Sequence, residues 1–219
     1  SGEQACGDVG LGRMLEPSEI IERLASLFEA GSLSNKSVLI TAGPTQEPID
    51  PVRYVTNRSS GKMGYALAEA ATELGAQVTL VSGPVNLEAP SSCHLVSVKT
   101  AEEMYEAVMH HAKGKDIYIG TAAVADYSPL TVKASKIKKD INNSPLVLEM
   151  KENQDILKAV SELEDRPYVV GFAAETEDLL KNARKKLKKK KLDLIIANDV
   201  SDNSIGFDSN ENEVTLITD

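Results

Sequence analysis

The residues of this 219-residue chain that most clearly could do chemistry are Gly61-Lys62-Met63-Gly64, which open a predicted helix. A buried apolar run, residues 38–42, precedes them, and a second apolar run follows the helix at residues 77–81. This spacing predicts a right-handed βαβ unit whose ligand edge lies where the first strand ends. No Glu or Gln stands at the third helical position to cap the helix. Its free N–H groups therefore suit an anion such as a phosphate.

Neither of the two common phosphate loops fits these residues. Thr56 stands where a Walker A loop needs its first Gly, and Met63 stands where that loop needs Ser or Thr. A dinucleotide fingerprint needs Gly-x-Gly directly after the strand, where only Gly43 occurs. Gly61 and Gly64 alone are as well explained by close packing of the helix on a strand. The long proline-rich loop before the helix, residues 43–57, is the more specific signal.

Other catalytic arrangements are missing from the sequence. There is no Gly-x-Ser-x-Gly elbow and no plausible Cys–His pair. His110 and His111 are adjacent, hence about 100° apart on a helix, and make poor co-ligands for a metal. Cys6 and Cys93 form neither a disulfide framework nor a zinc pattern.

The overall charge restricts the partners of the chain. A formal net charge of −9 argues against a nucleic-acid surface, which normally needs a basic excess. The exceptions are local: Lys136-Ile137-Lys138-Lys139 and the basic run from Arg184 to Lys191. No apolar run approaches the roughly 18 residues of a membrane span, and the start lacks the basic and apolar regions of a signal peptide. We therefore expect a cytoplasmic protein with no membrane and no nucleic-acid partner.

The elements that must position these residues alternate between strand and helix. This order predicts an α/β fold: a doubly wound, Rossmann-like, mostly parallel sheet with helices on both faces. Residues 203–218 read as a hairpin-like ending. The predicted strands lie near 38–42, 77–81, 94–98, 116–120, 146–150, 168–173 and 193–197, and the helices near 61–74, 100–114, 155–163 and 177–191.

Two segments fall outside this alternation. Residues 1–16 are Gly-rich and read as a tail, and Ser18 then caps a short amphipathic helix within a linker, residues 17–36. The segment from Tyr127 to about Pro145 is rich in Lys, Asn and Ser and has no hydrophobic period. We expect it to be a lid that orders around a nucleotide, because it buries too little apolar surface to offset its ordering entropy.

Several blocks of residues, taken in one order, resemble phosphopantothenate–cysteine ligase, the synthetase half of a bifunctional bacterial enzyme of coenzyme A biosynthesis. The resemblance covers about residues 37–217. Residues 5–14 are similar instead to the end of the flavin-dependent decarboxylase half of that enzyme. The blocks are Ala42-Gly43-Pro44-Thr45, Asp50-Pro51-Val52-Arg53, residues 57–64, Ala122-Ala123-Val124-Ala125-Asp126-Tyr127, residues 136–139, residues 171–176 and Ala197-Asn198-Asp199-Val200.

The resemblance implies a ligase that activates a carboxylate with CTP. Family members transfer the CMP unit of CTP to the carboxylate of 4′-phosphopantothenate and release pyrophosphate. The amine of L-cysteine then attacks the acyl-cytidylate, and CMP leaves. Mg²⁺ is the expected companion of the triphosphate, bound mainly by phosphate oxygens and water. No protein nucleophile is needed for this chemistry, and none is visible.

The resemblance also assigns residues. Asn57 corresponds to the Asn that holds the acyl-cytidylate, and Lys136 to the Lys that neutralises the triphosphate; without it, Asn57 reads as a turn residue and Lys136 as a solvated lysine. Arg53 suits a phosphate or carboxylate, across a subunit boundary if the protein is a dimer. The remaining substrate-binding residues at the helix start are Ser59, Ser60, Gly61, Lys62 and Met63.

A second set is expected to bind the nucleotide. Lys186 and Lys190 lie four apart on one helix face, so both could point at one anion, although lysines that complement the helix dipole explain them too. Asp155 reads equally as a helix cap, Phe172 as a core residue, and Asp126 as a weak metal ligand. The full set is Ala122, Ala123, Asp126, Lys136, Gln154, Asp155, Ile156, Leu157, Phe172, Lys186 and Lys190.

The family implies a domain organisation and further partners. We expect residues 1–16 to be the remaining end of the decarboxylase half, 17–36 the linker, and 37–219 a ligase domain that stops short of the family's usual carboxyl end. FMN would belong only to the missing decarboxylase half, so Cys6 would be an idle thiol. A homodimer is the expected assembly.

Two other classes of protein stay open. A short-chain nicotinamide oxidoreductase would carry Tyr-x-x-x-Lys, but Thr131 and Phe172 stand four residues after Tyr127 and Tyr168. A non-catalytic nucleotide-binding module would bind the nucleotide without releasing pyrophosphate.

Overall fold

The computed structural model describes residues 31–139, 145–175, 179–199 and 214–218, together with the backbone of residues 2–3 and 9–10. The short strands β1 (Gly2–Glu3) and β2 (Val9–Gly10) pair antiparallel. The predicted linker helix after Ser18 lies outside the described residues. The first described contact of the main body is made by Leu33, whose N–H donates to Leu74 O.

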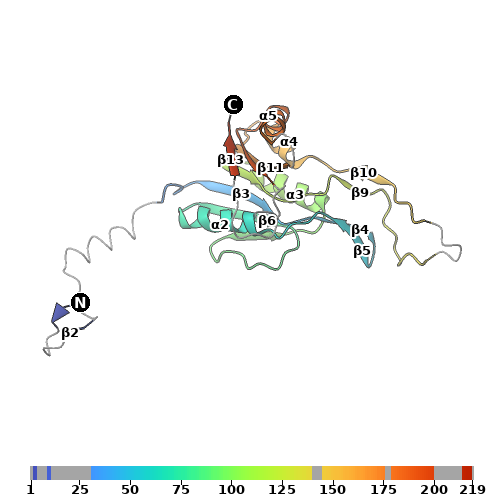
Figure 1. The fold of residues 1–219 in the computed structure, drawn as a ribbon, viewed down its shortest axis with the longest axis horizontal. Coiled ribbons are helices and arrows are strands. Elements are labelled where there is room, and N and C mark those ends of the chain that lie inside the picture. The colour runs from blue at the N-terminus through green and yellow to red at the C-terminus, as the bar shows by residue number, and fades with distance from the viewer. Residues whose placement is uncertain are drawn as a thin grey trace.

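A seven-stranded sheet forms the centre of the molecule (Figure 1). Six strands are parallel, and only β13, at one edge, runs antiparallel to its neighbour. The predicted α/β fold with a mostly parallel sheet is therefore confirmed. In spatial order the strands are β13 (Val214–Ile217), β12 (Leu194–Asp199), β11 (Tyr168–Glu175), β8 (Ile117–Gly120), β3 (Ser37–Ala42), β6 (Gln77–Ser82) and β7 (His94–Ser97).

Helices cover both faces of the sheet, and the alternation within β3 explains how. Val38 and Ile40 pack in one apolar cluster with α2 (Lys62–Glu73). Leu39 points to the other face, into the cluster formed with α3 (Ala101–Ala112), α4 (Ile156–Ser161) and α5 (Leu179–Lys189). Successive side chains of a strand point to opposite faces, so one apolar run serves both layers.

The start of α2 lies unusually close to the sheet. A Cβ built on Gly64 would lie 2.5 Å from Ala42 Cβ and 2.6 Å from Thr121 Oγ1. Gly61 has φ +78° and precedes the helix without a side-chain cap. The absence of a capping side chain was predicted, and the packing explanation for the two glycines is also correct.

The proline-rich segment before α2 was predicted as a loop, and this prediction is wrong. The chain forms an antiparallel hairpin there, β4 (Gln46–Asp50) with β5 (Arg53–Thr56). The hairpin is fastened at its base, because the buried Glu47 carboxylate accepts from Ala101 N at the start of α3 (2.9 Å). Prolines at an edge do not prevent pairing.

The predicted lid also has more structure than expected. Its first residues form β9 (Tyr127–Pro129), which pairs antiparallel with β10 (Met150–Glu152). The strand predicted at 146–150 is thus displaced to 150–152. Residues 140–144 lie outside the described residues. The segment 127–139 lies beside the β4–β5 hairpin, where Lys133 N donates to Ile49 O (3.0 Å); both project from the same end of the molecule (Figure 1).

Candidate active site at the carboxyl ends of the parallel strands

A cavity of about 240 Å³ opens where β8 ends, and it gathers residues far apart in the sequence. Every predicted nucleotide-binding residue except Lys136 contributes to its wall. Asn57 and the other residues predicted at the start of α2 are not in the lining, nor is Arg53. The lining residues are Thr41, Tyr118, Gly120, Thr121, Ala122, Ala123, Val124, Ala125, Asp126, Glu152, Asn153, Gln154, Asp155, Ile156, Leu157, Phe172, Lys186 and Lys190.

The segment after β8, residues 121–125, forms one wall and is held firmly by the end of β3. Thr121 Oγ1 donates to Thr41 O (2.5 Å), and Ala123 N donates to Gly43 O (2.9 Å). Ala125 N donates to the hydroxyl of the fully buried Thr45 (3.0 Å). The small side chains of this wall leave room for a ligand, while its backbone is already fixed in place.

Asn57 connects the entry of α2 to this wall. Its Nδ2 donates to Val124 O (3.0 Å) and lies 3.4 Å from Ala123 O. The residue is exposed. Nearby, Gly61 N donates to Ser59 Oγ (3.3 Å), so one predicted donor of the helix start already has a partner.

The opposite wall is built on the loop between β10 and α4. Asn153 Nδ2 donates to Ala125 O (2.9 Å), and Asn153 Oδ1 accepts from Ser128 Oγ (2.7 Å). Asp155 is the N-cap of α4 and accepts from Lys158 N (3.1 Å), so its explanation as a helix cap is correct. The same residue still lines the cavity.

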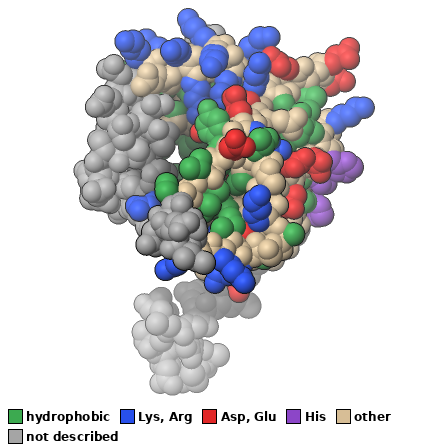
Figure 2. All heavy atoms as spheres, turned by 90° about the vertical axis from the view of Figure 1, so that its right-hand side faces the viewer, with side chains coloured by type: hydrophobic (Ala, Val, Ile, Leu, Met, Phe, Trp, Pro, Cys, Tyr) green, Lys and Arg blue, Asp and Glu red, His purple; other side chains and the backbone are tan. Residues whose placement is uncertain are grey.

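Lys186 of α5 and Lys190, which follows the last residue of that helix, have different partners in this structure. Lys186 Nζ donates to Phe172 O (2.7 Å), whereas Lys190 Nζ forms an ion pair with Asp155 Oδ2 (3.0 Å). Both side chains nevertheless line the cavity. Basic side chains gather along the top of the face shown in Figure 2, the level at which α5 lies in Figure 1.

Tyr118 forms the floor of the cavity, from the middle of β8. Its side chain is fully buried, and burial raises its pKa. The phenol therefore stays neutral at ordinary pH and serves as a polar floor. Sequence reasoning did not single out Tyr118; a hydroxyl side chain within an apolar strand was the available signal. The resemblance already matched Asn153 to a nucleotide-binding position, and Thr45 belongs to one of the blocks that carry it.

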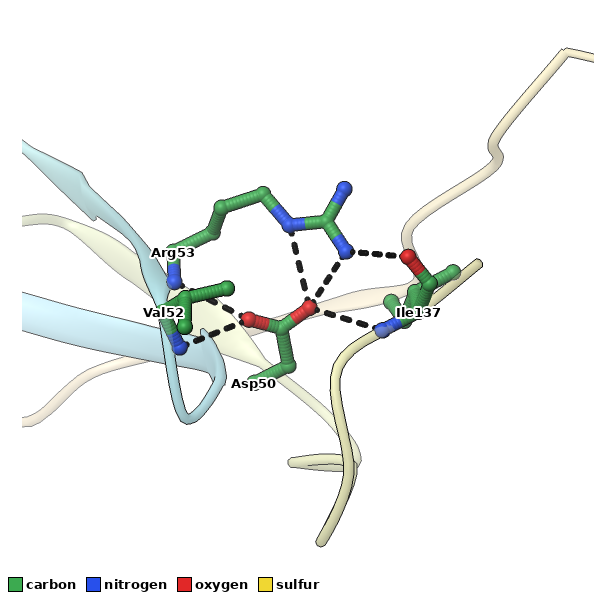
Figure 3. A network of polar contacts seen from close by, with 4 residues as sticks. All are labelled: Asp50, Val52, Arg53 and Ile137. Carbon is green, nitrogen blue, oxygen red and sulfur yellow. Dashed lines mark hydrogen bonds and ion pairs between the residues drawn. The ribbon is translucent and has the colours of Figure 1, made fainter. Parts of the chain in front are cut away.

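Arg53 and Lys136 lie outside the cavity lining, and Arg53 and Asp50 both contact Ile137, the residue after Lys136 (Figure 3). Asp50, at the end of β4, forms an ion pair with Arg53, and the Arg53 Nη2 group also donates to Ile137 O (2.8 Å). The Arg53 hydrogen bond holds the pKa of Asp50 well below its usual range. Lys136 is exposed and immediately precedes Ile137.

No metal cage accompanies these residues in the described part of the chain, where no three His, Cys, Asp or Glu side chains cluster. Asp126, the weak candidate, therefore belongs to no such group among these residues. Within the same residues, no helix is both long and apolar enough to cross a bilayer.

A doubly wound sheet with a cavity at the carboxyl ends of its strands is typical of Rossmann-like α/β proteins, which bind their ligands at this edge. Comparison with known proteins narrows the class. Residues 33–219 match the DNA/pantothenate metabolism flavoprotein C-terminal domain, and this chain belongs to that family.

Similar proteins carry a common name. The chain is 56% identical over 217 residues to the coenzyme A biosynthesis bifunctional protein CoaBC of Vibrio vulnificus (strain YJ016), covering 99% of this chain and 54% of that protein. It is 51% identical over 219 residues to the Escherichia coli (strain K12) protein of the same name, with 99% and 54% covered. The chain thus spans about half the length of these relatives.

A solved structure agrees in fold. The crystal structure of the C-terminal domain of a coenzyme A biosynthesis bifunctional protein CoaBC superimposes with a TM-score of 0.71 at 45% sequence identity. The match covers 84% of this chain and 82% of that one.

Proposed function

We propose that this chain is the ligase that joins 4′-phosphopantothenate to L-cysteine with CTP. A substrate carboxylate oxygen attacks the α-phosphorus of CTP, and pyrophosphate leaves. The cysteine amine then attacks the acyl carbon of the acyl-cytidylate, loses a proton, and CMP leaves. The observation that carries the proposal is the cavity, whose wall contains ten of the eleven residues expected to bind the nucleotide.

The cavity suits a nucleotide whose phosphates run toward α5. Ala122 and Ala123 leave space against a fixed backbone, and Phe172 and Leu157 supply apolar wall. Lys186 and Lys190 lie where they could exchange their present partners for phosphate oxygens. Mg²⁺ would be held mainly by the triphosphate itself, with Asp126 as one carboxylate of the wall that could take part, since no cage of protein ligands is found among the described residues.

Asn57 would hold the acyl-cytidylate at the rim of this cavity. Its amide is fixed against Val124, one of the lining residues, and the start of α2 lies directly behind it. Ser59, Ser60, Gly61, Lys62 and Met63 would receive the phosphate of 4′-phosphopantothenate at the helix start. Lys136 would neutralise the triphosphate during pyrophosphate release, approaching from outside the cavity.

The longer relatives support a larger assembly for the natural protein. We infer fusion to a decarboxylase half that carries FMN, because the relatives are named bifunctional and extend beyond this chain. A homodimer in the cytoplasm, with Arg53 acting across the subunit boundary, completes the proposal.

Pyrophosphate release from CTP, with and without 4′-phosphopantothenate, tests the function. Release that depends on 4′-phosphopantothenate supports the ligase. Binding of CTP with no release would favour a non-catalytic nucleotide-binding module, which the described cavity would also serve. Replacing CTP by ATP in the same assay measures how strictly the base is selected.

A further inference from the structure

The carboxylate of Asp50 is the most heavily bonded acidic group in the described structure, and nothing above gives it a role. Its side chain is 0% exposed, beside an Arg53 side chain that is 41% exposed. Oδ1 accepts from the N–H groups of Val52 and Arg53, both at 2.9 Å. Oδ2 accepts from Arg53 Nε (3.0 Å), from Arg53 Nη2 and from Ile137 N (3.0 Å).

The Asp50–Arg53 ion pair binds both backbone polar groups of Ile137, and this pair of contacts forms a grip on that residue (Figure 3). Asp50 accepts the N–H of Ile137, and Arg53 donates to its C=O at 2.8 Å. Both polar groups of residue 137 are therefore bound by a pair that lies more than 80 positions earlier in the chain. Consecutive Cα atoms are about 3.8 Å apart, so holding the backbone of Ile137 also restricts the position of the Lys136 backbone.

We propose that Asp50 is a positioning residue that sets two cationic groups of the site at once, the guanidinium of Arg53 and the ammonium of Lys136. The inference rests on the proposed function, in which both groups meet substrate anions. Asp50 itself touches neither substrate. It orients Arg53 by a charge-assisted bond and holds the segment of Lys136 against the β4–β5 hairpin.

The exposure of the residues before Ile137 indicates that the grip mainly positions this segment and adds little to the stability of the fold. Leu130 and Val132 of the same segment are 57% and 51% exposed, and residues 131–136 are all exposed. A segment that buries so little apolar surface adds little to the core. Burying a carboxylate to bind such a segment is costly unless the group is fully bonded, as it is here.

Asp50→Asn is the direct test, because it keeps the shape and removes the charge. We expect pyrophosphate release to show a higher KM for CTP and a lower kcat, by about tenfold or more in kcat/KM. A purely structural role would lower the active fraction, hence the apparent kcat, and leave KM unchanged. An unchanged kcat/KM, or a loss confined to kcat that follows thermal unfolding, would overturn the proposal.

Asp116→Asn is the matched control. Asp116 also accepts from a backbone N–H, that of Ser37 (2.8 Å), and from Lys36 Nζ (2.9 Å), but it lies at the amino-terminal ends of β3 and β8. It should lose thermal stability and keep the wild-type KM for CTP. A double variant with Lys136→Gln adds a second criterion. Because Asp50 acts partly through Lys136, the loss of kcat/KM in the double variant should be smaller than the product of the two single losses, and a loss equal to that product contradicts the grip.

A third measurement does not depend on the enzyme activity. Amide exchange at Ile137 should be about tenfold or more faster in Asp50→Asn than in the wild type. Ile137→Pro removes the N–H that Asp50 accepts and should reproduce the kinetic defect, whereas Ile137→Val keeps the backbone and should not. Unaltered exchange at Ile137 refutes the grip even if the ligase assay of the wild type succeeds. If that assay fails, the exchange measurement still tests whether Asp50 binds the backbone of Ile137.

Discussion

The variant Asn57→Asp distinguishes a catalytic role of Asn57 from a structural one, because the expected loss of stability is small and the expected loss of rate is large. The change removes the Nδ2 donor to Val124 O and puts a carboxylate 3.4 Å or less from two carbonyl oxygens. One neutral hydrogen bond is worth about 1 kcal/mol, and the exposed side chain can turn to solvent to escape the repulsion. A loss of about 1 kcal/mol should lower Tm by roughly 2–4 °C in a domain of this size.

The expected loss of activity is much larger. Removing a single fixed donor from a developing anion typically costs about 3 kcal/mol, a factor of roughly 100 to 1,000 in rate. The new negative charge beside an anionic acyl-cytidylate adds to that loss. Single-turnover kinetics with CTP, 4′-phosphopantothenate and L-cysteine should show an acyl-cytidylate that forms but reacts slowly with the amine.

Asn35→Asp is the matched control for Asn57→Asp. Asn35 is exposed in a turn before the amino-terminal end of β3, whereas the cavity lies at the carboxyl ends of the strands, and it has φ +64°, which both Asn and Asp adopt. This variant adds the same charge and should turn over normally. Normal turnover by Asn57→Asp, or a rate loss no larger than that of the control, would remove Asn57 from the site.

Three further outcomes follow from the structure. Lys136→Gln should slow pyrophosphate release far more than it lowers Tm, since Lys136 is exposed; equally slow turnover of chemically made acyl-cytidylate would contradict a first-step role. Gly64→Ala should destabilise the fold by about 1–3 kcal/mol in urea unfolding, because its Cβ would meet Ala42 Cβ at 2.5 Å, a clash larger than the gain in helix propensity. The pKa of His111 is lowered, first by burial and then by His110 and His94, so the unfolded state binds more protons. Stability should therefore fall as pH decreases through about 6.5, and His111→Gln should flatten that fall; an unchanged slope would exclude His111 as its source.

The central sheet could be predicted from the sequence because its evidence is local. Runs such as residues 38–42 are largely apolar and buried throughout, as is typical of parallel strands covered on both faces. Thr100 and Glu103 form the predicted capping box, and α3 begins directly after Thr100. Patterns of this kind depend on a few consecutive residues, so no knowledge of distant contacts was needed.

The hairpin and the displaced strand could not be predicted, because their evidence is not local. β4 carries three polar residues and a proline with no regular alternation, and β10 is exposed throughout. They are strands only because β5 and β9 lie opposite them. The partners of Asp50 illustrate the same limit for the site: the motif around Arg53 was visible, but its contact with Ile137 joins residues 84 positions apart.

The wall of the cavity draws on positions from Thr41 to Lys190, on three central strands and two helices. A ligand bound there contacts the ends of β3, β8 and β11 together, so partial separation of these strands dissolves the binding site. Ligand binding should therefore raise the free energy of global unfolding, and its effect should not be limited to the ordering of one loop. A ligand at about 100 times its Kd adds about 2.7 kcal/mol to the free energy of unfolding. Thermal-shift screening is accordingly a suitable way to rank compounds for this cavity, without any assay of turnover.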